Sequence, residues 1–169
     1  MIGKGGATRR WRTPLPDWTV VHPPIETIRL PIPMDRLTPE RRHRLMSRVR
    51  SKDTQPETII RRMVFGMGYR YRLHDKRFPG KPDLVFIGRK KAIFVNGCFW
   101  HGHIGCRYAR TPKSNVSFWK EKIERNRERD RFNLKRLEAL GWKVLVVWQC
   151  ELKDKEALAG TLYEFLEHA

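Results

Sequence analysis

The sequence predicts a mixed α/β fold in which helices flank a small mixed sheet. Helical periodicity alternates with short apolar runs in the order α-α-β-β-β-α-β-α, which is typical of this class. The chain has 169 residues, of which 40% are hydrophobic, so it can build the core of one compact domain. Seven of the eleven prolines lie in residues 1–39, before this pattern is established. We therefore expect a proline-rich basic arm at 1–36 and a folded domain at 37–169.

The first half of the domain is expected to hold two helices and three strands. Thr38 is a plausible N-cap, with Pro39 at the first helical position, for a very basic helix that reaches about residue 50. A second helix is expected at 56–67, because its apolar residues share one face and Gly68 can end it. Short strands are expected at 69–73, 83–87 and 92–95.

The second half begins with a loop rich in His, Cys and Gly, which runs to about residue 113. A long helix is expected at 117–140, with Gly141 after its end. The apolar run at 142–148 predicts a buried strand, and a last helix is expected at 155–167 with Asp154 as its N-cap.

Charge indicates the class of partner. Lys and Arg number 36 against 18 Asp and Glu, which gives a net charge of +18. Such a charge opposes compaction unless a polyanion neutralises it, so nucleic acid or an acidic membrane surface is favoured over a merely soluble basic protein. No apolar run approaches the roughly 20 residues that span a bilayer, and the N-terminus lacks a secretory apolar region. Three cysteines, an odd number, suit free or metal-bound thiols in a reducing, cytoplasmic or nucleoid location.

The cysteines and one histidine have the spacing of a metal site. Cys98, His103 and Cys106 lie close together in the loop, and Cys150 follows the last strand. Three sulfurs and one imidazole make a closed tetrahedral set for structural Zn²⁺. The alternative is three unrelated buried thiols.

A second metal is expected at Asp83, which opens an apolar strand. A carboxylate there is costly to bury unless it binds a cation or hydrogen-bond donors. Nucleases commonly hold Mg²⁺ with one or two carboxylates and backbone oxygens, and the carbonyl of Val95 on the adjacent strand can supply one. The alternative for Asp83 is a turn cap.

His101 is a candidate general base, because a neutral imidazole can take a proton from water. It needs an orienting acceptor. Asn126 and Asp130 are four residues apart and interrupt an apolar face of the long helix, so Asp130 is a candidate partner. The alternative is a solvated acid on an arginine-rich helix.

Aromatic residues among cations can wedge between bases. Phe99 and Trp100 lie in the His/Cys loop and Trp119 begins the long helix, while Met46 on the basic first helix could enter from the other side. Arg48 on that helix is a candidate phosphate contact. The alternative for these aromatics is ordinary core packing.

Five segments in this order closely resemble the very short patch repair (Vsr) endonucleases, and the likeness covers about residues 37 to 165. The resemblance implies a restriction-endonuclease-like fold. It also implies Mg²⁺-dependent nicking of one DNA strand on the 5′ side of the T in a T·G mismatch, which arises when 5-methylcytosine deaminates. The matching segments are Leu45–Glu57, Phe78–Asp83, Phe94–His101, Phe118–Asp130 and Gly141–Cys150.

The resemblance also assigns roles to residues. Asp83 resembles the principal Mg²⁺ ligand with the Val95 carbonyl beside it, and Glu57 an acid that supports the metal site through water. His101 resembles the general base and Asp130 its partner. The remaining matches are structural or contact DNA. The Zn²⁺ ligands are Cys98, His103, Cys106 and Cys150; the wedge is Phe99, Trp100 and Trp119, with Met46 in the minor groove; further DNA contacts are Arg48 and Asn126.

Partners implied by the resemblance are double-stranded DNA with a T·G mismatch, mismatch-repair proteins and a DNA cytosine methyltransferase system, with the enzyme acting as a monomer in bacterial cytoplasm.

Two positions depart from the family. Asn96 stands where a His is usual, and the spacing from His103 to Cys106 is one residue longer.

Two other functions remain open at this point. One is a restriction or modification-dependent DNA endonuclease on the same fold, and the other is a non-catalytic zinc-containing DNA-binding protein. A pure binder would not need Asp83, His101 and Asp130 together, so their presence favours an enzyme.

Overall fold

The computed structural model describes residues 38–48 and 52–168, which all belong to one compact unit. The predicted arm at 1–36 and the expected end of the first helix near residue 50 lie outside the described residues. A four-stranded mixed sheet organises the unit, in the order β1 (Arg72–Leu73), β2 (Leu84–Phe86), β3 (Lys91–Asn96) and β4 (Lys143–Trp148). The first three strands are antiparallel, and β4 pairs with β3 in parallel. The mixed α/β class predicted from the sequence is confirmed.

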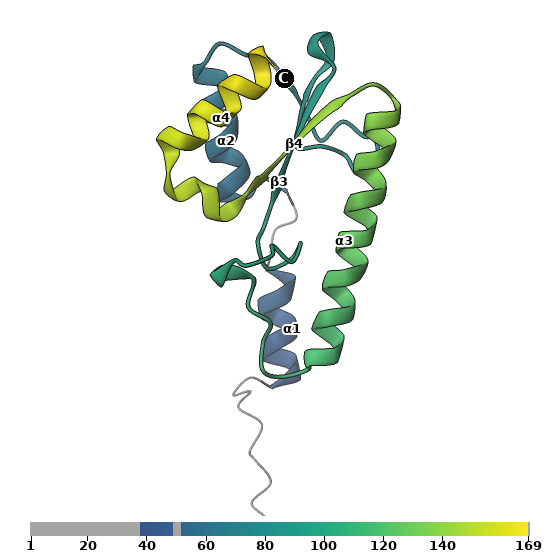
Figure 1. Cartoon of the computed structure of the whole chain (residues 1–169). Helices are drawn as coiled ribbons and strands as arrows, with labels where there is room; N and C mark the ends of the chain where they lie inside the picture. The colour runs from purple at the N-terminus through teal and green to yellow at the C-terminus, as the bar shows by residue number, and fades with distance from the viewer. Residues whose placement is uncertain (1–37, 49–51, 169) are drawn as a thin grey trace, which may run out of the picture. The chain divides into compact units, whose positions relative to one another are not determined.

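Helices cover both faces of this sheet (Figure 1). The helices are α1 (Pro39–Ser47), α2 (Gln55–Gly66), α3 (Val116–Ala139) and α4 (Lys155–Glu167). In Figure 1, α2 and α4 lie on one side of β3 and β4, and α3 lies on the other. None of the helices in the described part of the chain combines the length and the apolar character needed to cross a bilayer.

The main core lies between the sheet and the α2–α4 layer. Alternate side chains of a strand point to opposite faces, so every second residue of β2, β3 and β4 reaches this layer. Burying apolar surface is the main driving force for this arrangement. The buried cluster consists of Ile60 and Val64 of α2, Leu84, Phe86, Ile93 and Val147 of the sheet, and Leu158, Leu162, Phe165 and Leu166 of α4.

The start of α2 is fixed by its own side chains. Thr54 is the N-cap and accepts a hydrogen bond from the Glu57 N–H, while the Glu57 carboxylate accepts from the Thr54 N–H at 3.4 Å. This reciprocal capping box satisfies two N–H groups that the first helical turn leaves without partners. As a result, Glu57 is held at the helix start and is only 4% exposed.

The parallel pairing of β3 and β4 brings two distant segments together. α3 is the crossover between them, and their register runs from Lys91 opposite Lys143 to Asn96 opposite Trp148. Parallel strands end at the same edge of a sheet, so the loop after β3 and the turn after β4 begin side by side. That turn is a short 3₁₀ helix, Gln149–Lys153.

One predicted strand is much shorter in the structure. A strand was expected at 69–73, but only Arg72 and Leu73 pair, opposite Val85 and Leu84. β2 has three residues and offers no longer partner. Tyr69 instead bonds through its N–H to the Val64 carbonyl at the end of α2. The other expected elements lie within a few residues of their predicted bounds.

The loop after β3 packs closely on α3 at Gly102. This residue has φ +61°, and a Cβ built there would lie 2.6 Å from the Ile123 side chain. Gly105 also has a positive φ, +71°, but a Cβ there would meet nothing within 4 Å. Both glycines therefore supply a left-handed backbone, and only Gly102 is also required for close approach.

We expect Gly102→Ala to destabilise the protein more than Gly105→Ala does. Gly105→Ala, the control, introduces only the strain of a non-glycine residue in the left-handed region, roughly 1–2 kcal/mol. Gly102→Ala introduces the same strain and must also displace Ile123. Thermal unfolding of both purified variants measures the difference. Equal losses of stability would contradict the role of close packing between this loop and α3.

Candidate active site and metal centre

A cavity of about 870 Å³ lies at the end of the sheet where β3 stops. Its walls come from elements far apart in the sequence: Glu57 from α2, Asp83 and His74 from the antiparallel strand ends, His101 from the loop after β3, and Asp130 from α3. The topology explains this convergence. β2 begins, and β1 and β3 end, at the same edge, so residues just before β2 and just after β1 meet there.

Asp83 lies in this cavity immediately before β2. Its Oδ2 accepts a hydrogen bond of 2.7 Å from the Val95 N–H, and its Oδ1 lies 3.4 Å from His74 Nδ1. Its side chain is 17% exposed. The main chain of Val95 therefore lies directly beside the carboxylate, although the contact observed is through nitrogen rather than the carbonyl considered above.

The electrostatic setting of Asp83 makes its ionised form less favourable than that of an ordinary carboxyl when no cation is bound. Burial raises the pKa of Asp83 to about 6, the Val95 N–H lowers it, and the nearby negative charge of Glu57 raises it again. The electrostatic influence of His74 and Arg61 lowers the pKa of Asp83. A carboxylate with this balance gains from a cation that neutralises it.

His101 and Asp130 form a pair across the cavity. His101 Nδ1 lies 2.5 Å from Asp130 Oδ2. Burial alone would raise the pKa of Asp130, but the hydrogen bond with His101 and the electrostatic influence of His101 and Arg129 lower it below its ordinary value. The ionised carboxylate therefore holds the proton of the imidazole on Nδ1, which leaves Nε2 free to act as an acceptor.

Asn126 lies one helical turn before Asp130 and fixes the same loop. Its Nδ2 donates to the Trp100 carbonyl at 2.9 Å. The two polar residues on the inner face of α3 thus contact consecutive residues of the loop, Trp100 and His101. This arrangement sets the position of the imidazole relative to the cavity.

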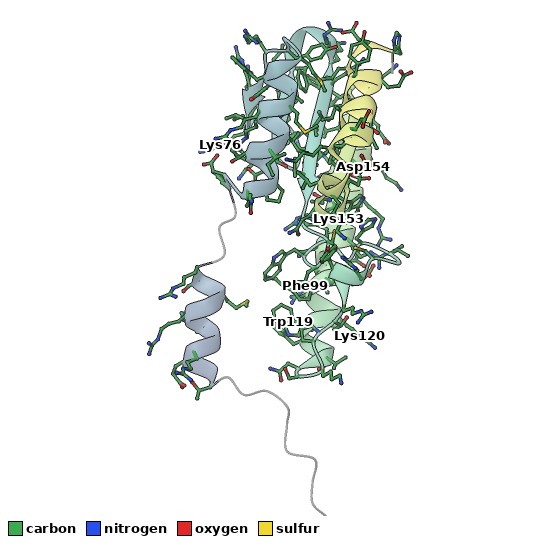
Figure 2. The ribbon with its side chains drawn as sticks, turned by 90° about the vertical axis from the view of Figure 1, so that its left-hand side faces the viewer. Lys76, Phe99, Trp119, Lys120, Lys153 and Asp154 are labelled. Carbon is green, nitrogen blue, oxygen red and sulfur yellow. The ribbon has the colours of Figure 1, made fainter. Side chains whose placement is uncertain are left out.

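An aromatic cluster borders the site. The rings of Phe99, Trp100 and Trp119 meet edge to face, with centroid separations of 5.1, 5.2 and 6.0 Å. Figure 2 shows Phe99 and Trp119 projecting from the same side of the ribbon. Phe118, which the sequence analysis did not single out, extends the cluster at 5.1 Å from Trp119 and is 52% exposed.

Positively charged side chains stand around the cavity. Lys52, Lys76 and Lys81 line it from the α2 and β2 sides, and Arg129 lines it from α3. Met46 of α1 also borders it and is 41% exposed. Arg48 is exposed just beyond α1, and Asn96, at the end of β3, is buried against the cavity wall. A polyanion at the cavity would therefore meet several cations.

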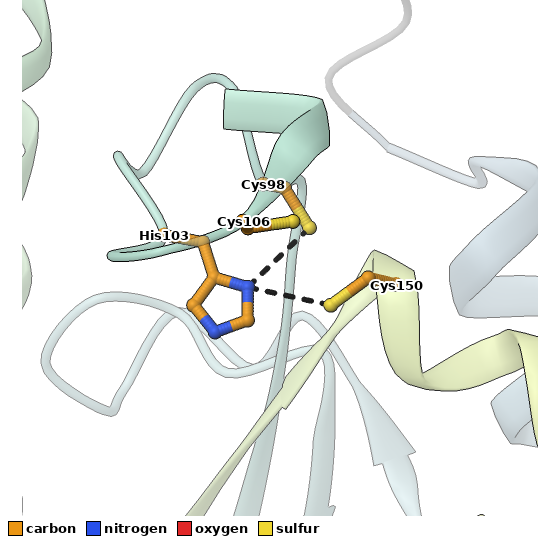
Figure 3. Close-up of side chains that lie close together, drawn as sticks. All are labelled: Cys98, His103, Cys106 and Cys150. Carbon is orange, nitrogen blue, oxygen red and sulfur yellow. Dashed lines mark hydrogen bonds between the residues drawn. The ribbon is translucent and has the colours of Figure 1, made fainter. Parts of the chain in front are cut away.

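A separate group of sulfur and nitrogen atoms lies beyond the cavity (Figure 3). Cys98, His103 and Cys106 come from the loop after β3, and Cys150 comes from the turn after β4. One donor atom from each of the four lies within 4.8 Å of the others. His103 Nδ1 is 3.6 Å from Cys98 Sγ and 3.3 Å from Cys150 Sγ.

The donor set fits a tetrahedral ion. Zn²⁺ binds sulfur at about 2.3 Å and nitrogen at about 2.0–2.1 Å, which places the two donors roughly 3.5 Å apart in a tetrahedron. The two sulfur–nitrogen distances match this value. The His103 ring also stacks on Trp148, with centroids 4.1 Å apart and planes 6° from parallel, so its orientation is fixed.

Cys98 is fully buried, and this affects its ionisation. Burial raises the pKa of its thiol to about 12, and hydrogen bonds with the neighbouring Cys150 and Cys106 thiols act in the same direction, against a lowering bond to the Cys150 backbone. A metal ligand must be the thiolate, so an ion bound here would displace a proton that the metal-free protein retains.

Glu57 is buried beside the cavity and does not contact Asp83 directly. Its Oε2 accepts from the Asp53 N–H at 3.0 Å and from Arg61 at 2.8 Å, and it lies 3.5 Å from His74 Nε2. Neither His74 nor Arg61 was predicted from the sequence to lie at this site. For His74, the available signal was the antiparallel pairing of the two strands on either side of the Phe78–Pro82 loop. This pairing brings His74, which follows the first strand, beside Asp83, which precedes the second.

The chain is similar to several known proteins. The family model described as "DNA mismatch endonuclease Vsr" matches residues 34–107. Among solved structures, the chain is similar to the catalytic domain of the homing endonuclease I-Bth0305I, with 23% identity and a TM-score of 0.45 over 67% of this chain and 94% of that one.

Several curated relatives are more similar in sequence. A type II nicking enzyme of Xanthomonas oryzae, V.XorIIP, is 53% identical over 79% of this chain and 97% of its own length. The nicking enzyme V.NmeAIP of Neisseria meningitidis is 49% identical over 72% and 86%. The DNA mismatch endonuclease Vsr of Escherichia coli is 40% identical over 75% and 81%. The chain therefore belongs to the Vsr family of DNA mismatch endonucleases and is a hydrolase that cuts DNA.

Proposed function

We propose that the chain is a Mg²⁺-dependent endonuclease that nicks one DNA strand on the 5′ side of the T in T·G mismatches. The observation that carries the proposal is that Asp83, the His101–Asp130 pair and the aromatic residue Trp100 border one cavity rimmed by lysines. A relative named a mismatch endonuclease and two named nicking enzymes support the choice of reaction.

Asp83 would hold the magnesium ion, with the Val95 main chain beside it and Glu57 nearby. The fit rests on the chemistry of the donors, since a largely buried carboxylate with a raised pKa gains from a hard cation. When bound, Mg²⁺ would polarise the scissile phosphate and stabilise the negative charge that develops on it. Glu57 adds negative charge to the cavity, which favours cations over neutral ligands.

His101 would accept the proton of the attacking water at Nε2. Its Nδ1 is committed to Asp130, and the ionised carboxylate stabilises the imidazolium that forms. Asn126 holds the Trp100 carbonyl next to this histidine, so it is a positioning residue.

The aromatic cluster would open the duplex at the mismatch. Phe99, Trp100 and Trp119 are partly exposed, and their rings brace one another edge to face. A mismatched base costs less to unstack than a paired one, so a wedge of this kind favours T·G over T·A. The lysines at the cavity rim and the exposed Arg48 would bind phosphates.

The Cys/His group, which consists of Cys98, His103, Cys106 and Cys150, would hold a structural Zn²⁺. All four donors come from segments that begin at the ends of β3 and β4, so an ion there would tie the loop that carries His101 to the sheet. A closed set of three thiolates and one imidazole leaves no open position for substrate, which is why a structural role is proposed.

The substrate proposal predicts strand-specific nicking. On duplexes that differ only at one base pair, we expect a T·G mismatch to be nicked 5′ of the T at least about tenfold faster than T·A, given the few kcal/mol that separate unstacking of the two. Denaturing gels of each labelled strand measure this preference and the cut position. Faster cutting of a fully paired duplex, or of one containing 5-methylcytosine, would instead favour a restriction or modification-dependent enzyme.

The metal proposal predicts opposite effects of Asp83→Asn on activity and stability. Nicking should fall by roughly a thousandfold, as expected when several kcal/mol of transition-state stabilisation are lost. Since the pKa of Asp83 is raised to about 6, charging it in the folded state costs roughly 3 kcal/mol. That destabilisation is absent below about pH 4, the ordinary pKa of an aspartate, and complete above about pH 6.

Magnesium-free Asp83→Asn should therefore unfold roughly 6–12 °C higher than wild type at pH 8, with little difference at pH 4. Calorimetric melting at both pH values, without chelators that would strip zinc, checks the sign. A variant that is less stable at pH 8, or that nicks at the wild-type rate, contradicts the assignment.

Zinc binding is tested with a pair of histidine variants. His103→Ala should lose the bound metal and unfold roughly 10 °C or more below wild type, because metal binding and folding are coupled. His168→Ala removes an exposed histidine outside the group and should keep one zinc per chain. Metal content by mass spectrometry and thermal melting give the two readouts, and a folded His103→Ala protein with full zinc would refute the site.

A further inference from the structure

A buried arginine stands within a group of residues that could otherwise hold a metal ion. Donor atoms of Asp53, Glu57 and His74 lie within 4.8 Å of one another. Arg61 already provides a cation to this group, with contacts of 2.5 Å to Asp53 Oδ1 and 2.8 Å to Glu57 Oε2. Its side chain is 13% exposed, so the guanidinium is a built-in part of the site.

The same arginine determines which nitrogen of His74 carries the proton. Arg61 Nη2 lies 2.8 Å from His74 Nε2. A guanidinium can only donate, so Nε2 must be the accepting, unprotonated nitrogen. The proton of the neutral ring is then on Nδ1, the atom that faces Asp83 Oδ1 at 3.4 Å.

Asp83 is thus approached by a donor on each oxygen. The Val95 N–H bonds Oδ2, and the His74 Nδ1–H faces Oδ1. The carboxylate thus lies between the main chain of Val95 and the ring of His74. Glu57, at the start of α2, contributes by holding Arg61, which in turn holds the ring of His74.

The backbone at His74 indicates that the contacts of this residue are maintained against strain. His74 has φ +45°, in the left-handed region that costs a non-glycine residue roughly 1–2 kcal/mol. Strained conformations of this kind persist where surrounding contacts hold them, often at functional sites. At 16% exposure, the side chain of His74 is largely enclosed by the groups just described.

We propose that His74 is a positioning residue for the catalytic carboxylate Asp83, and that Arg61 and Glu57 fix it in the tautomer that donates from Nδ1. This inference rests on the proposed magnesium role of Asp83. Outer partners that orient a metal ligand typically contribute 10–100-fold in metal affinity, which is the scale of effect expected here.

The tautomer is tested by nitrogen-15 NMR of histidine side chains in the full-length, zinc-bound protein at pH 8. The signals of His74 are identified by their loss in His74→Asn. We expect a protonated Nδ1 and an unprotonated Nε2 in the wild type. In Arg61→Met the donor to Nε2 is lost, and the proton should move to Nε2, which faces Glu57 at 3.5 Å.

Arg62→Met is the matched control, since Arg62 is an exposed neighbour on the same helix. It should leave the His74 signals unchanged. A wild-type ring protonated on Nε2, or no change in Arg61→Met, overturns the proposal. The wild-type spectrum is decisive even if Arg61→Met fails to fold.

Metal affinity is the second readout, measured without DNA by titrating Mn²⁺ and following its electron paramagnetic resonance signal. His74→Ala should weaken Mn²⁺ binding about tenfold. His74→Asn keeps an N–H donor near the position of Nδ1 and tolerates a positive φ, so it should stay within about threefold of wild type. Equal losses in the two variants contradict a role through donation to Asp83.

Asp83→Asn separates this inference from the proposed function. If Mn²⁺ binding survives Asp83→Asn, the magnesium role of Asp83 is wrong, whatever the tautomer of His74. If Asp83→Asn abolishes binding while His74→Ala leaves it unchanged, Asp83 remains the ligand and the positioning role of His74 is wrong.

Discussion

The parallel pairing of β3 with β4 is the constraint on which the site depends. Strand ends that share one edge bring together a loop that begins at residue 97 and a turn that begins at residue 149. The Cys/His group spans that junction, and the loop between its ligands carries His101. If this register slipped by one residue, alternate side chains would exchange faces, and both the core and the ligand group would be lost.

Near this junction, the protein contains two features that lower the stability of the fold. Asp83 is buried next to the negative charge of Glu57, and His74 holds an unfavourable backbone conformation. Neither Asp83 nor His74 belongs to the hydrophobic cluster between the sheet and the α2–α4 layer. The cavity thus combines a carboxylate of raised pKa with a strained backbone, a combination often found at functional sites.

Elements with strong local signals were predictable from the sequence. α4 and its Asp154 cap depend on periodicity and capping, and both are present where expected. The inward face of α3 could also be read from the spacing of Asn126 and Asp130. His74 and Arg61 were harder to find, because His74 meets Asp83 only through the pairing of β1 with β2, and Arg61 reaches His74 only through the packing of α2 beside that strand pair. β1 has only two residues, and no local pattern distinguishes such a strand from a loop.

The distribution of the site along the chain has a consequence for biosynthesis. A nascent chain that extends only to Leu140 already contains Asp83, His101 and Asp130, but it lacks β4 and Cys150. Without β4, the outer edge of β3 is unpaired, and the loop that carries His101 is not joined to the rest of the sheet. Because domains fold as units once their long-range contacts can form, we expect the proposed active site to assemble only after β4 has been synthesised. The order of elements along the chain thus places completion of this site late in translation.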